Sequence, residues 1–396
     1  MPRRPAACRI RLFASGVLAV ALLLATGCST KDATTGAGTN RGASRPAPVT
    51  AGPGVTDSTI TLGVLTDQTG PFAEVSQDMQ VGRTLFWDER NANGGVCGRK
   101  VRFLIRDHHY EVPRAVAGYT ELRPKVLAFA ELLGSPELAA LDSKVRADRI
   151  LTMAASWSSR LLGNPYLVIT GATYDVETID GISWLYQHEG LHRGDTIGHI
   201  YLQGDYGQDA AAGSRAAAAG YGLRLDEQMI EPTDRDLTAQ ISALRDAGAR
   251  HVVLSTTPAQ TAAAIGAADA LGYRPTFLAT APAYHPALLR TPARDTLLGH
   301  LLVTTPIAPF ASVLPGPTRV RAMFQDRYPG RRASLWINVG YAQATVMAQV
   351  LQSACDRRTL TRPGLMTALH GIKHSDASGL VPRWTTATAG RSPPAR

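Results

Sequence analysis

The sequence predicts an α/β protein of two lobes, each built around a doubly wound parallel sheet. Short stretches with the alternating apolar pattern of β-strands take turns with amphipathic stretches of helical period. One such series ends near residue 170, and a second begins near residue 196. The roughly 340 residues that follow the N-terminal region exceed what one hydrophobic core usually serves. Parallel strands need crossover helices, so two doubly wound sheets follow.

The first strand–helix–strand unit lies between residues 60 and 105. Residues 60–64 alternate as a half-buried strand does, and residues 101–105 do so again. Between them, residues 81–90 place their apolar side chains on one helical face. The Asn- and Gly-rich stretch 91–95 ends this helix, because Asn and Gly tolerate the left-handed conformation of a helix exit.

The same reasoning places the remaining elements. In the first series we expect helices at 113–122 and 136–147 and strands at 126–133 and 150–155. In the second series we expect strands at 196–202, 223–229, 251–255 and 276–279 and helices at 208–219, 237–247 and 259–271. A strand at 301–305 and helices at 320–328 and 338–354 complete the prediction.

The N-terminus has the features of an export signal. Residues 12–25 form an apolar stretch that follows four arginines and is shorter than a membrane-spanning helix. Small residues precede Cys28 as in a bacterial lipobox, which predicts a signal peptide over 1–27 and a lipid on Cys28. The alternative is an ordinary secretory signal with an incidental cysteine. Residues 28–56, rich in Thr, Gly, Ala and Pro, read as a flexible tether, so we expect the protein on the outer face of the cell membrane.

Charge and cysteine content narrow the function further. Without the four signal arginines, the net charge of +9 falls to about +5, and no basic cluster interleaved with aromatic residues suggests nucleic-acid binding. Cys97 and Cys355 remain in an oxidising compartment, where a disulfide is favoured over two free thiols. No metal-ligand spacing appears, and we expect neither a metal nor a cofactor.

The amino-acid sequence of residues 65–72 and 91–101 resembles the N-terminal part of the branched-chain amino-acid-binding family of periplasmic type I solute-binding proteins. These are the extracytoplasmic receptors of ABC importers. The resemblance extends in register from about residue 57 to about residue 384. It implies a monomer that binds a small molecule in a cleft between lobes and meets ABC permease subunits.

The resemblance also implies three chain crossings between the lobes, which together form the hinge. They are expected near residues 170–171, residues 305–306 and Gly371. The first lobe would then comprise 57–170 and 306–370, and the second 171–305 and 371–396, with a terminal strand at 379–384.

Two segments of the first lobe are candidates for binding a ligand carboxylate. Residues 134–137 follow a strand and open a helix, where Ser135 and the exposed amides could receive an anion. Simple capping of the helix is the alternative, but the family aligns a ligand-binding serine here. Ala154 and Ser156 match the family segment of Pro-Ala-Ala-Thr type that holds the ligand α-carboxylate, although a capping turn would look similar.

The second lobe contributes two further candidates. The family carries a tyrosine that closes over the ligand at the position of Tyr206. Thr256 matches only the position of an aromatic contact. Asp205 is commonly acidic in the family for reasons of loop structure.

One departure from the family concerns ligand identity. Amino-acid binders place an acidic residue near residues 279–283 to pair with the ligand ammonium, and this chain has none between Asp269 and Asp295. A buried ammonium without a partner is costly. Either another acid such as Asp205 substitutes, or the ligand is not a standard amino acid. Val75 also stands where the family often has an aromatic residue that lines the side-chain end of the ligand site. Trp157 and Tyr284 either stack on a ring or sugar of the ligand or simply pack against neighbouring residues.

The sequence therefore predicts a lipid-anchored receptor for a carboxylate-bearing solute, an amino acid or a related compound. No nucleophile elbow, zinc-protease motif or phosphate-binding loop suggests an enzyme, and we expect no catalytic residue. Two alternatives share the fold: a receptor that senses the ligand without transport, and a surface scaffold that has lost ligand binding.

Overall fold

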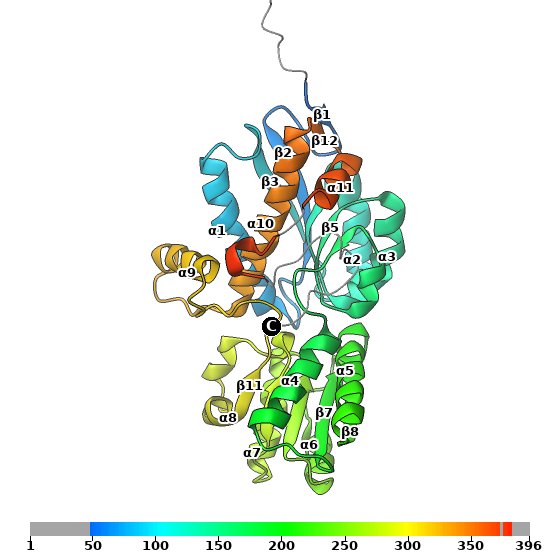
Figure 1. The fold of residues 1–396 in the computed structure, drawn as a ribbon, viewed down its shortest axis with the longest axis vertical. Coiled ribbons are helices and arrows are strands. Elements are labelled where there is room, and N and C mark those ends of the chain that lie inside the picture. The colour runs from blue at the N-terminus through cyan, green and yellow to red at the C-terminus, as the bar shows by residue number, and fades with distance from the viewer. Residues whose placement is uncertain (1–47, 373–374, 382–396) are drawn as a thin grey trace, which may run out of the picture. The chain divides into compact units, whose positions relative to one another are not determined.

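The computed structural model describes residues 48–372 and 375–381, which form two α/β lobes (Figure 1). The sheet of the first lobe has the strand order β3-β2-β4-β5-β6, and all its neighbours are parallel. Its strands are β2 (Thr59–Thr66), β3 (Lys100–Asp107), β4 (Phe129–Leu133), β5 (Thr152–Ala155) and β6 (Leu167–Val168). Its helices are α1 (Ala73–Ala92), α2 (Val112–Leu122), α3 (Ser135–Asp148), α9 (Pro315–Arg327), α10 (Leu335–Asp356) and α11 (Arg362–His370).

The second lobe repeats this winding with the order β11-β10-β9-β7-β8, again all parallel. Its strands are β7 (Thr196–Leu202), β8 (Arg224–Ile230), β9 (His251–Ser255), β10 (Thr276–Ala279) and β11 (Leu301–Val303). Its helices are α4 (Tyr174–His188), α5 (Asp205–Tyr221), α6 (Thr238–Asp246), α7 (Pro258–Ala270) and α8 (Arg294–His300). The predicted α/β class with doubly wound sheets is confirmed.

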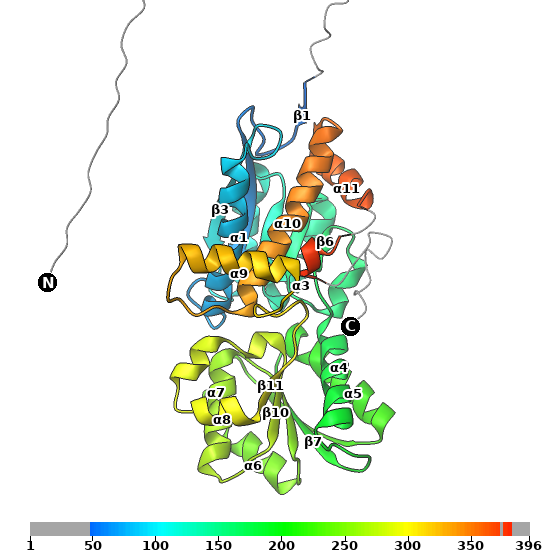
Figure 2. The same cartoon turned by 60° about the vertical axis from the view of Figure 1, so that its left-hand side comes forward.

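Helices cover both faces of each sheet, which explains the strand sequences (Figure 2). Along β2, Val64 belongs to the core shared with α1 and α10, and its neighbour Leu65 to the core shared with α2 and α3. In β7 every residue is buried. Residues 60–64 were expected to form a half-buried strand from their alternation, but β2 is buried on both faces, as a parallel strand between two layers of helices is.

Helices α1 and α10 come into close backbone contact although they lie far apart in the sequence. A Cβ atom on Gly82 would overlap the carbonyl of Ile337, and one on Gly340 would overlap the carbonyl of Met79. The disulfide between Cys97, just after α1, and Cys355, in the last turn of α10, joins the same pair of helices. Glycine at both crossing positions therefore lets the returning helix pack against the first.

The N-terminal boundary of the folded region differs from the prediction. Residues 48–56 were assigned to the tether, but Thr50–Ala51 forms strand β1 and pairs in parallel with β12 (Thr359–Leu360). A two-residue strand is too short to show a periodic pattern, so the sequence gives no sign of it. The predicted signal peptide and Cys28 lie outside the described residues.

The C-terminal boundary differs as well. Crossings occur between β6 and α4 and between β11 and α9, as expected. After Gly371, however, the described residues 375–381 lie beside the first lobe's helices: Ser375 Oγ donates to Gln349 Oε1 of α10 at 2.9 Å. The expected strand at 379–384 is not seen in its described part, because Ala377–Gly379 forms a short 3₁₀ helix. Residues 382–396, also assigned to the second lobe, lie outside the described residues.

Three of the described helices were missed, and several others, α1 most of all, begin earlier than predicted. In α4, the buried polar residues Glu177 and Thr178 and the internal Gly181 obscure the helical period. Helices α8 and α11 are short. Helix α1 begins at residue 73 rather than 81 because its first turns bury polar side chains, including Asp78.

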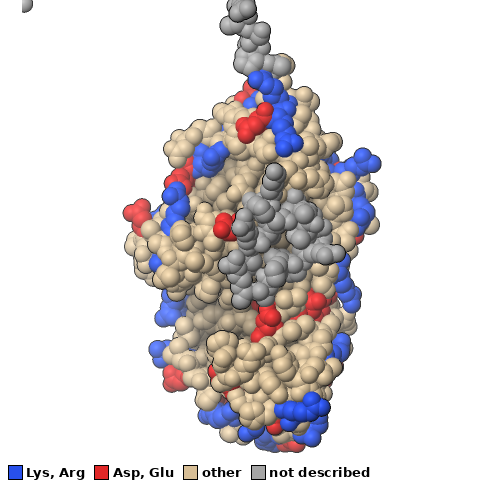
Figure 3. Space-filling model, viewed as in Figure 1, with Lys and Arg blue, Asp and Glu red and all other residues tan. Residues whose placement is uncertain are grey.

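The surface of the described chain agrees with the charge pattern of the sequence. On the face shown in Figure 3, basic and acidic side chains lie scattered among uncharged ones rather than gathered in a basic stripe. Within residues 48–372 and 375–381, we find no helix with the length and apolar character that crossing a bilayer demands.

Candidate functional site

A pocket lies between the two lobes, where the carboxyl ends of the two sheets face each other. Ligands of doubly wound sheets bind at this edge. The space between its lining residues, including the part open to solvent, is about 360 Å³. Its lining residues are Phe72, Val75, Met79, Tyr110, Leu133, Gly134, Ser135, Ala155, Trp157, Tyr174, Tyr206, Pro282 and Trp336.

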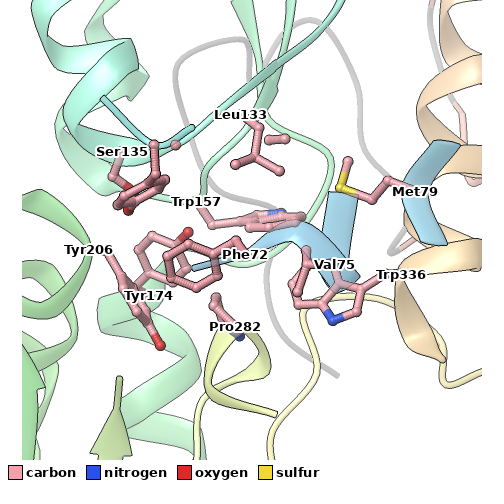
Figure 4. A pocket seen from close by; sticks show the side chains of 13 residues that line it. Phe72, Val75, Met79, Leu133, Ser135, Trp157, Tyr174, Tyr206, Pro282 and Trp336 are labelled. Carbon is pink, nitrogen blue, oxygen red and sulfur yellow. The ribbon is translucent and has the colours of Figure 1, made fainter. Parts of the chain in front are cut away.

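The two ends of this pocket differ in polarity (Figure 4). Ser135, Tyr174 and Tyr206 gather at one end. Val75, Met79 and Trp336, which come from α1 and α10, lie at the other. The site is therefore amphipathic along its length.

Hydroxyl groups converge on the N-terminus of α3 at the polar end. Ser135 Oγ lies 2.7 Å from Ser156 Oγ, and both groups are buried. Burial raises the pKa of Tyr174 to about 12, although hydrogen bonds with Ser135 and Ser156 oppose the rise. The Tyr174 hydroxyl is therefore neutral at physiological pH. Neutral hydroxyls beside the positive end of a helix favour an anion.

Tyr206 brings a second hydroxyl from the second lobe. It lies 2.7 Å from Thr280 Oγ1, and its ring centroid is 4.7 Å from that of Tyr174. Burial raises the pKa of Tyr206 well above its usual value, so this group too is a neutral donor. The two tyrosines form one wall of the polar end.

Local backbone geometry places Ser135 and Phe72 in the pocket. Gly134 adopts a φ of 104°, which a residue with a Cβ rarely does, and this bend turns the chain from β4 into α3. Asp67 fixes the turn after β2 by accepting hydrogen bonds from the backbone N–H groups of Gly70, at 2.5 Å, and Phe72, at 2.8 Å. Both turns follow the carboxyl end of a strand.

The predicted site residues fall into two groups. Ser135 and Tyr206 line the pocket, and Ser156 contacts Ser135 from behind. Ala154 and Thr256 do not line it. The Ala154 carbonyl accepts a hydrogen bond from Gln343 at 3.0 Å, and its neighbour Ala155 faces the pocket instead. The Thr256 hydroxyl pairs with Thr261 at 2.8 Å.

The acid-free segment contributes Pro282 to the pocket. Behind it, Glu177 accepts hydrogen bonds from Ala281 N–H at 2.7 Å and from Thr304 Oγ1 at 2.6 Å. Burial raises the pKa of Glu177 to about 7, and its carboxyl group holds the turn without lining the pocket. Asp205, the acid considered as a substitute, forms an ion pair with Arg160 at 2.8 Å and also lies outside the pocket lining.

Sequence reasoning missed most of the apolar lining. Tyr174 begins the unpredicted α4, while Met79 and Trp336 lie on helices that read as ordinary core. Trp157 was considered for stacking, and its ring packs 5.8 Å from that of Trp336 between centroids. A usable signal existed only for Phe72, because an Asp three residues before Gly-Pro is typical of a side-chain-stabilised turn.

A cluster of charged groups ties the lobes together beside the pocket. Asp78 of α1 lies 3.1 Å from His285 Nε2 of the second lobe, and it accepts from Arg331 and Ser334, each at 2.5 Å. Burial alone would raise the pKa of Asp78, but hydrogen bonds from His285 and Ser334 and the nearby positive charges lower it. This cluster is an ion-paired contact between lobes.

Two doubly wound lobes with an amphipathic pocket between them define a two-lobed solute-binding protein. Residues 59–392 match the family model described as periplasmic binding protein. The chain belongs to this family, which confirms the predicted type I fold. Members of the family are extracytoplasmic solute-binding proteins rather than enzymes.

Solved structures show the same relationship. A fatty acid ABC transporter substrate-binding protein from Thermomonospora curvata is 36% identical, with a TM-score of 0.84 over 87% of this chain and 88% of that one. A branched chain amino acid ABC transporter protein from Thermus thermophilus with bound valine is 18% identical, with a TM-score of 0.75 over 86% and 92%. A possible leucine/isoleucine/valine-binding protein from Rhodopirellula baltica is 20% identical, with a TM-score of 0.76 over 89% and 94%. None of the curated proteins compared with the chain matches it.

Proposed function

We propose that this chain is the substrate-binding protein of an ABC importer and that it binds a monocarboxylate with an apolar tail. The carboxylate would lie against Ser135 and Ser156 at the N-terminus of α3. The tail would extend toward Val75 and Met79. The observation that carries the proposal is the polarity of the pocket, which has hydroxyls at one end and apolar side chains at the other.

The pocket favours an apolar acid over an amino acid. None of the described residues that line it is acidic, so a ligand ammonium would find no ionic partner there. Burying an unpaired charge costs several kcal/mol or more. Pro282 lines the pocket where amino-acid binders place an acid. The carboxylate part of the sequence prediction is retained, and the amino-acid part becomes the less favoured alternative.

The comparisons support the same ligand class. The relative at 36% identity is described as a fatty acid ABC transporter substrate-binding protein. The branched-chain amino-acid proteins are below 25% identity and support only the fold. An apolar acid is therefore favoured both by the pocket and by the more similar relative.

Anchoring and signalling complete the proposal. A lipid on Cys28 would hold the protein on the outer face of the cell membrane as a monomer. A ligand that binds the closed form better would shift the lobes toward closure and present a joint surface to a permease. A receptor that only senses the ligand would use the same pocket, and neighbouring genes for permease and ATPase subunits would favour import.

The test is a binding series with the soluble form that begins after Cys28. Thermal shift and calorimetry would compare straight-chain alkanoates from butanoate to hexadecanoate with the matching primary alcohols and with leucine. An alkanoate at one hundred times its dissociation constant should stabilise the protein by about 2.7 kcal/mol. Alcohols should bind more weakly and leucine not at all. Binding of leucine without any alkanoate would overturn the proposed ligand class.

A double variant tests the carboxylate position. Ser135→Ala with Ser156→Ala should abolish alkanoate binding and leave the fold intact, because it removes two of the three hydroxyls at the α3 N-terminus. Ser242→Ala on α6, outside the pocket, is the matched control. Unchanged affinity in the double variant would exclude this carboxylate site.

A further inference from the structure

Glu137 is a buried carboxyl group without a partner directly behind the polar end of the pocket. Its exposed fraction is 0%, and no other described residue donates a hydrogen bond to either oxygen. Its carboxyl group fills the space beside Gly134, so that a Cβ on Gly134 would overlap it and contact Tyr110. Gly134 and Tyr110 both line the pocket.

The surroundings of Glu137 add negative rather than positive charge. The nearby acid is Asp67, and Tyr110 lies close enough to interact with Glu137, Asp67, Tyr174 and Tyr206. No Lys, Arg or His of the described chain forms an ion pair with Glu137. Burial, reinforced by Asp67, raises the pKa of Glu137 to about 8.

Several ionisable groups on the elements around α3 have partners of their own, while Lys144 and Arg149 are exposed to solvent. Burial keeps His108 neutral, with a pKa lowered to about 4. The remaining pairs are Asp148 with Arg123 and the Tyr119 hydroxyl, Asp205 with Arg160, and Asp209 with Ser159. The two cations in these pairs, Arg123 and Arg160, are therefore not available to Glu137 in the described arrangement.

We propose that Glu137 is the proton-linked specificity residue of the carboxylate site, and that it holds a proton whenever a ligand carboxylate binds beside Ser135. The inference rests on the proposed function. A bound carboxylate would be the third negative group in this buried cluster, after Asp67 and Glu137. Burial raises the pKa of Asp67 as well, but two backbone N–H groups donate to its carboxylate and oppose the rise, whereas no other described residue donates to Glu137. The proton therefore resides on Glu137, and above its pKa binding takes up one proton from solvent while the ligand stays anionic.

The test follows octanoate binding to the soluble wild-type protein from pH 7 to pH 9. Proton linkage predicts that Kd rises about tenfold over this range. Calorimetry in buffers of different ionisation enthalpy should show uptake of nearly one proton at pH 9 and about a tenth of one at pH 7. Glu137→Gln should bind octanoate with a Kd that is constant over the range and should take up no proton.

Two controls isolate the effect. Asp180→Asn removes another carboxyl group whose burial raises its pKa, but on α4 outside this pocket, and should keep the tenfold change. Octanol, which has no charge, should show no pH dependence. A Kd for octanoate that stays flat in the wild type, or that changes equally in Glu137→Gln, would overturn the inference while leaving the proposed function standing. No octanoate binding at pH 7 would contradict the proposed function itself.

Discussion

Two buried carboxyl groups on either side of the pocket have pKa values shifted in opposite directions. Asp78 meets an imidazole, a guanidinium and a hydroxyl, and its pKa falls below the usual 3.8. Glu137 meets no donor from another described residue, and its pKa rises from 4.5 to about 8. Burial raises the pKa of both groups, so the hydrogen-bond donors and positive charges around each carboxyl, rather than its depth of burial, decide which one is ionised.

Glu177 lies between these extremes. Two neutral groups donate to one of its oxygens, and the other has no partner among the described residues. Its pKa rises only to about 7. The three carboxyl groups therefore form a series in which each added donor, and above all each positive charge, favours the ionised form.

The largest expected effect comes from Glu137→Gln at alkaline pH. Because the folded-state pKa of Glu137 is raised above 4.5, the contribution of this group to stability is fully present below pH 4.5 and is lost as the pH rises toward 8. Each pH unit in this window is worth about 1.4 kcal/mol. Urea unfolding should therefore show the variant to be about 3–5 kcal/mol more stable than the wild type at pH 9, and similar at pH 4. Equal stability at pH 9 would mean that Glu137 ionises without penalty.

Asp78→Ala tests the opposite case and should cost about 2–4 kcal/mol at pH 7, because it leaves the Arg331 guanidinium without its carboxylate partner and removes the acceptor of His285 Nε2 and Ser334. The pKa of Asp78 is lowered, so its contribution is present above pH 3.8 and disappears as the pH falls through the folded-state value. Urea midpoints at pH 7 and pH 3 measure this loss. Asp295→Asn, at an exposed position of α8, should change neither.

Thr304→Val removes one donor from Glu177 and keeps the side-chain shape. The pKa of Glu177 should rise above 7, and the protein should lose about 1 kcal/mol at pH 8. The loss should shrink below pH 6, where the carboxyl is protonated in either protein. Urea titrations at pH 6 and pH 8 give the difference, and an equal loss at both would show that the hydroxyl serves packing instead.

Arg160→Ala gives the smallest expected change. Arg160 also pairs with an acid of the other lobe, Asp205, but its side chain is 63% exposed. Exposed ion pairs contribute about 0.5 kcal/mol or less, and salt screens them. A loss comparable to that of Asp78→Ala in urea unfolding would refute the idea that desolvation separates the buried Asp78 contacts from the exposed Arg160–Asp205 pair.

The sequence predicts the strands better than it predicts the pocket. Strands such as β7 and β9 can be recognised in the sequence because both of their faces are buried. Ser135 could be found because it follows a strand and opens a helix. The apolar end could not, since it forms only when α1 and α10, far apart in the chain, pack together.

The state of Glu137 shows the same limit more sharply. In the sequence it looks like an acid that complements the helix dipole of α3. Only the folded chain places Tyr110 and the Asp67 turn beside it and withholds every cationic partner in the described region. A titration that depends on neighbours from three separate segments cannot be read from local pattern.

The disulfide between Cys97 and Cys355 turns 258 residues of sequence separation into a covalent ring. All five described strands of the second lobe lie within that ring, and so do the two chain crossings that connect this lobe to the first, between β6 and α4 and between β11 and α9. A protease that cuts once at the exposed residues 231–233 would open the ring without releasing either fragment. In denaturing gel electrophoresis the nicked protein would migrate as one species without reductant and as two fragments once the disulfide is reduced.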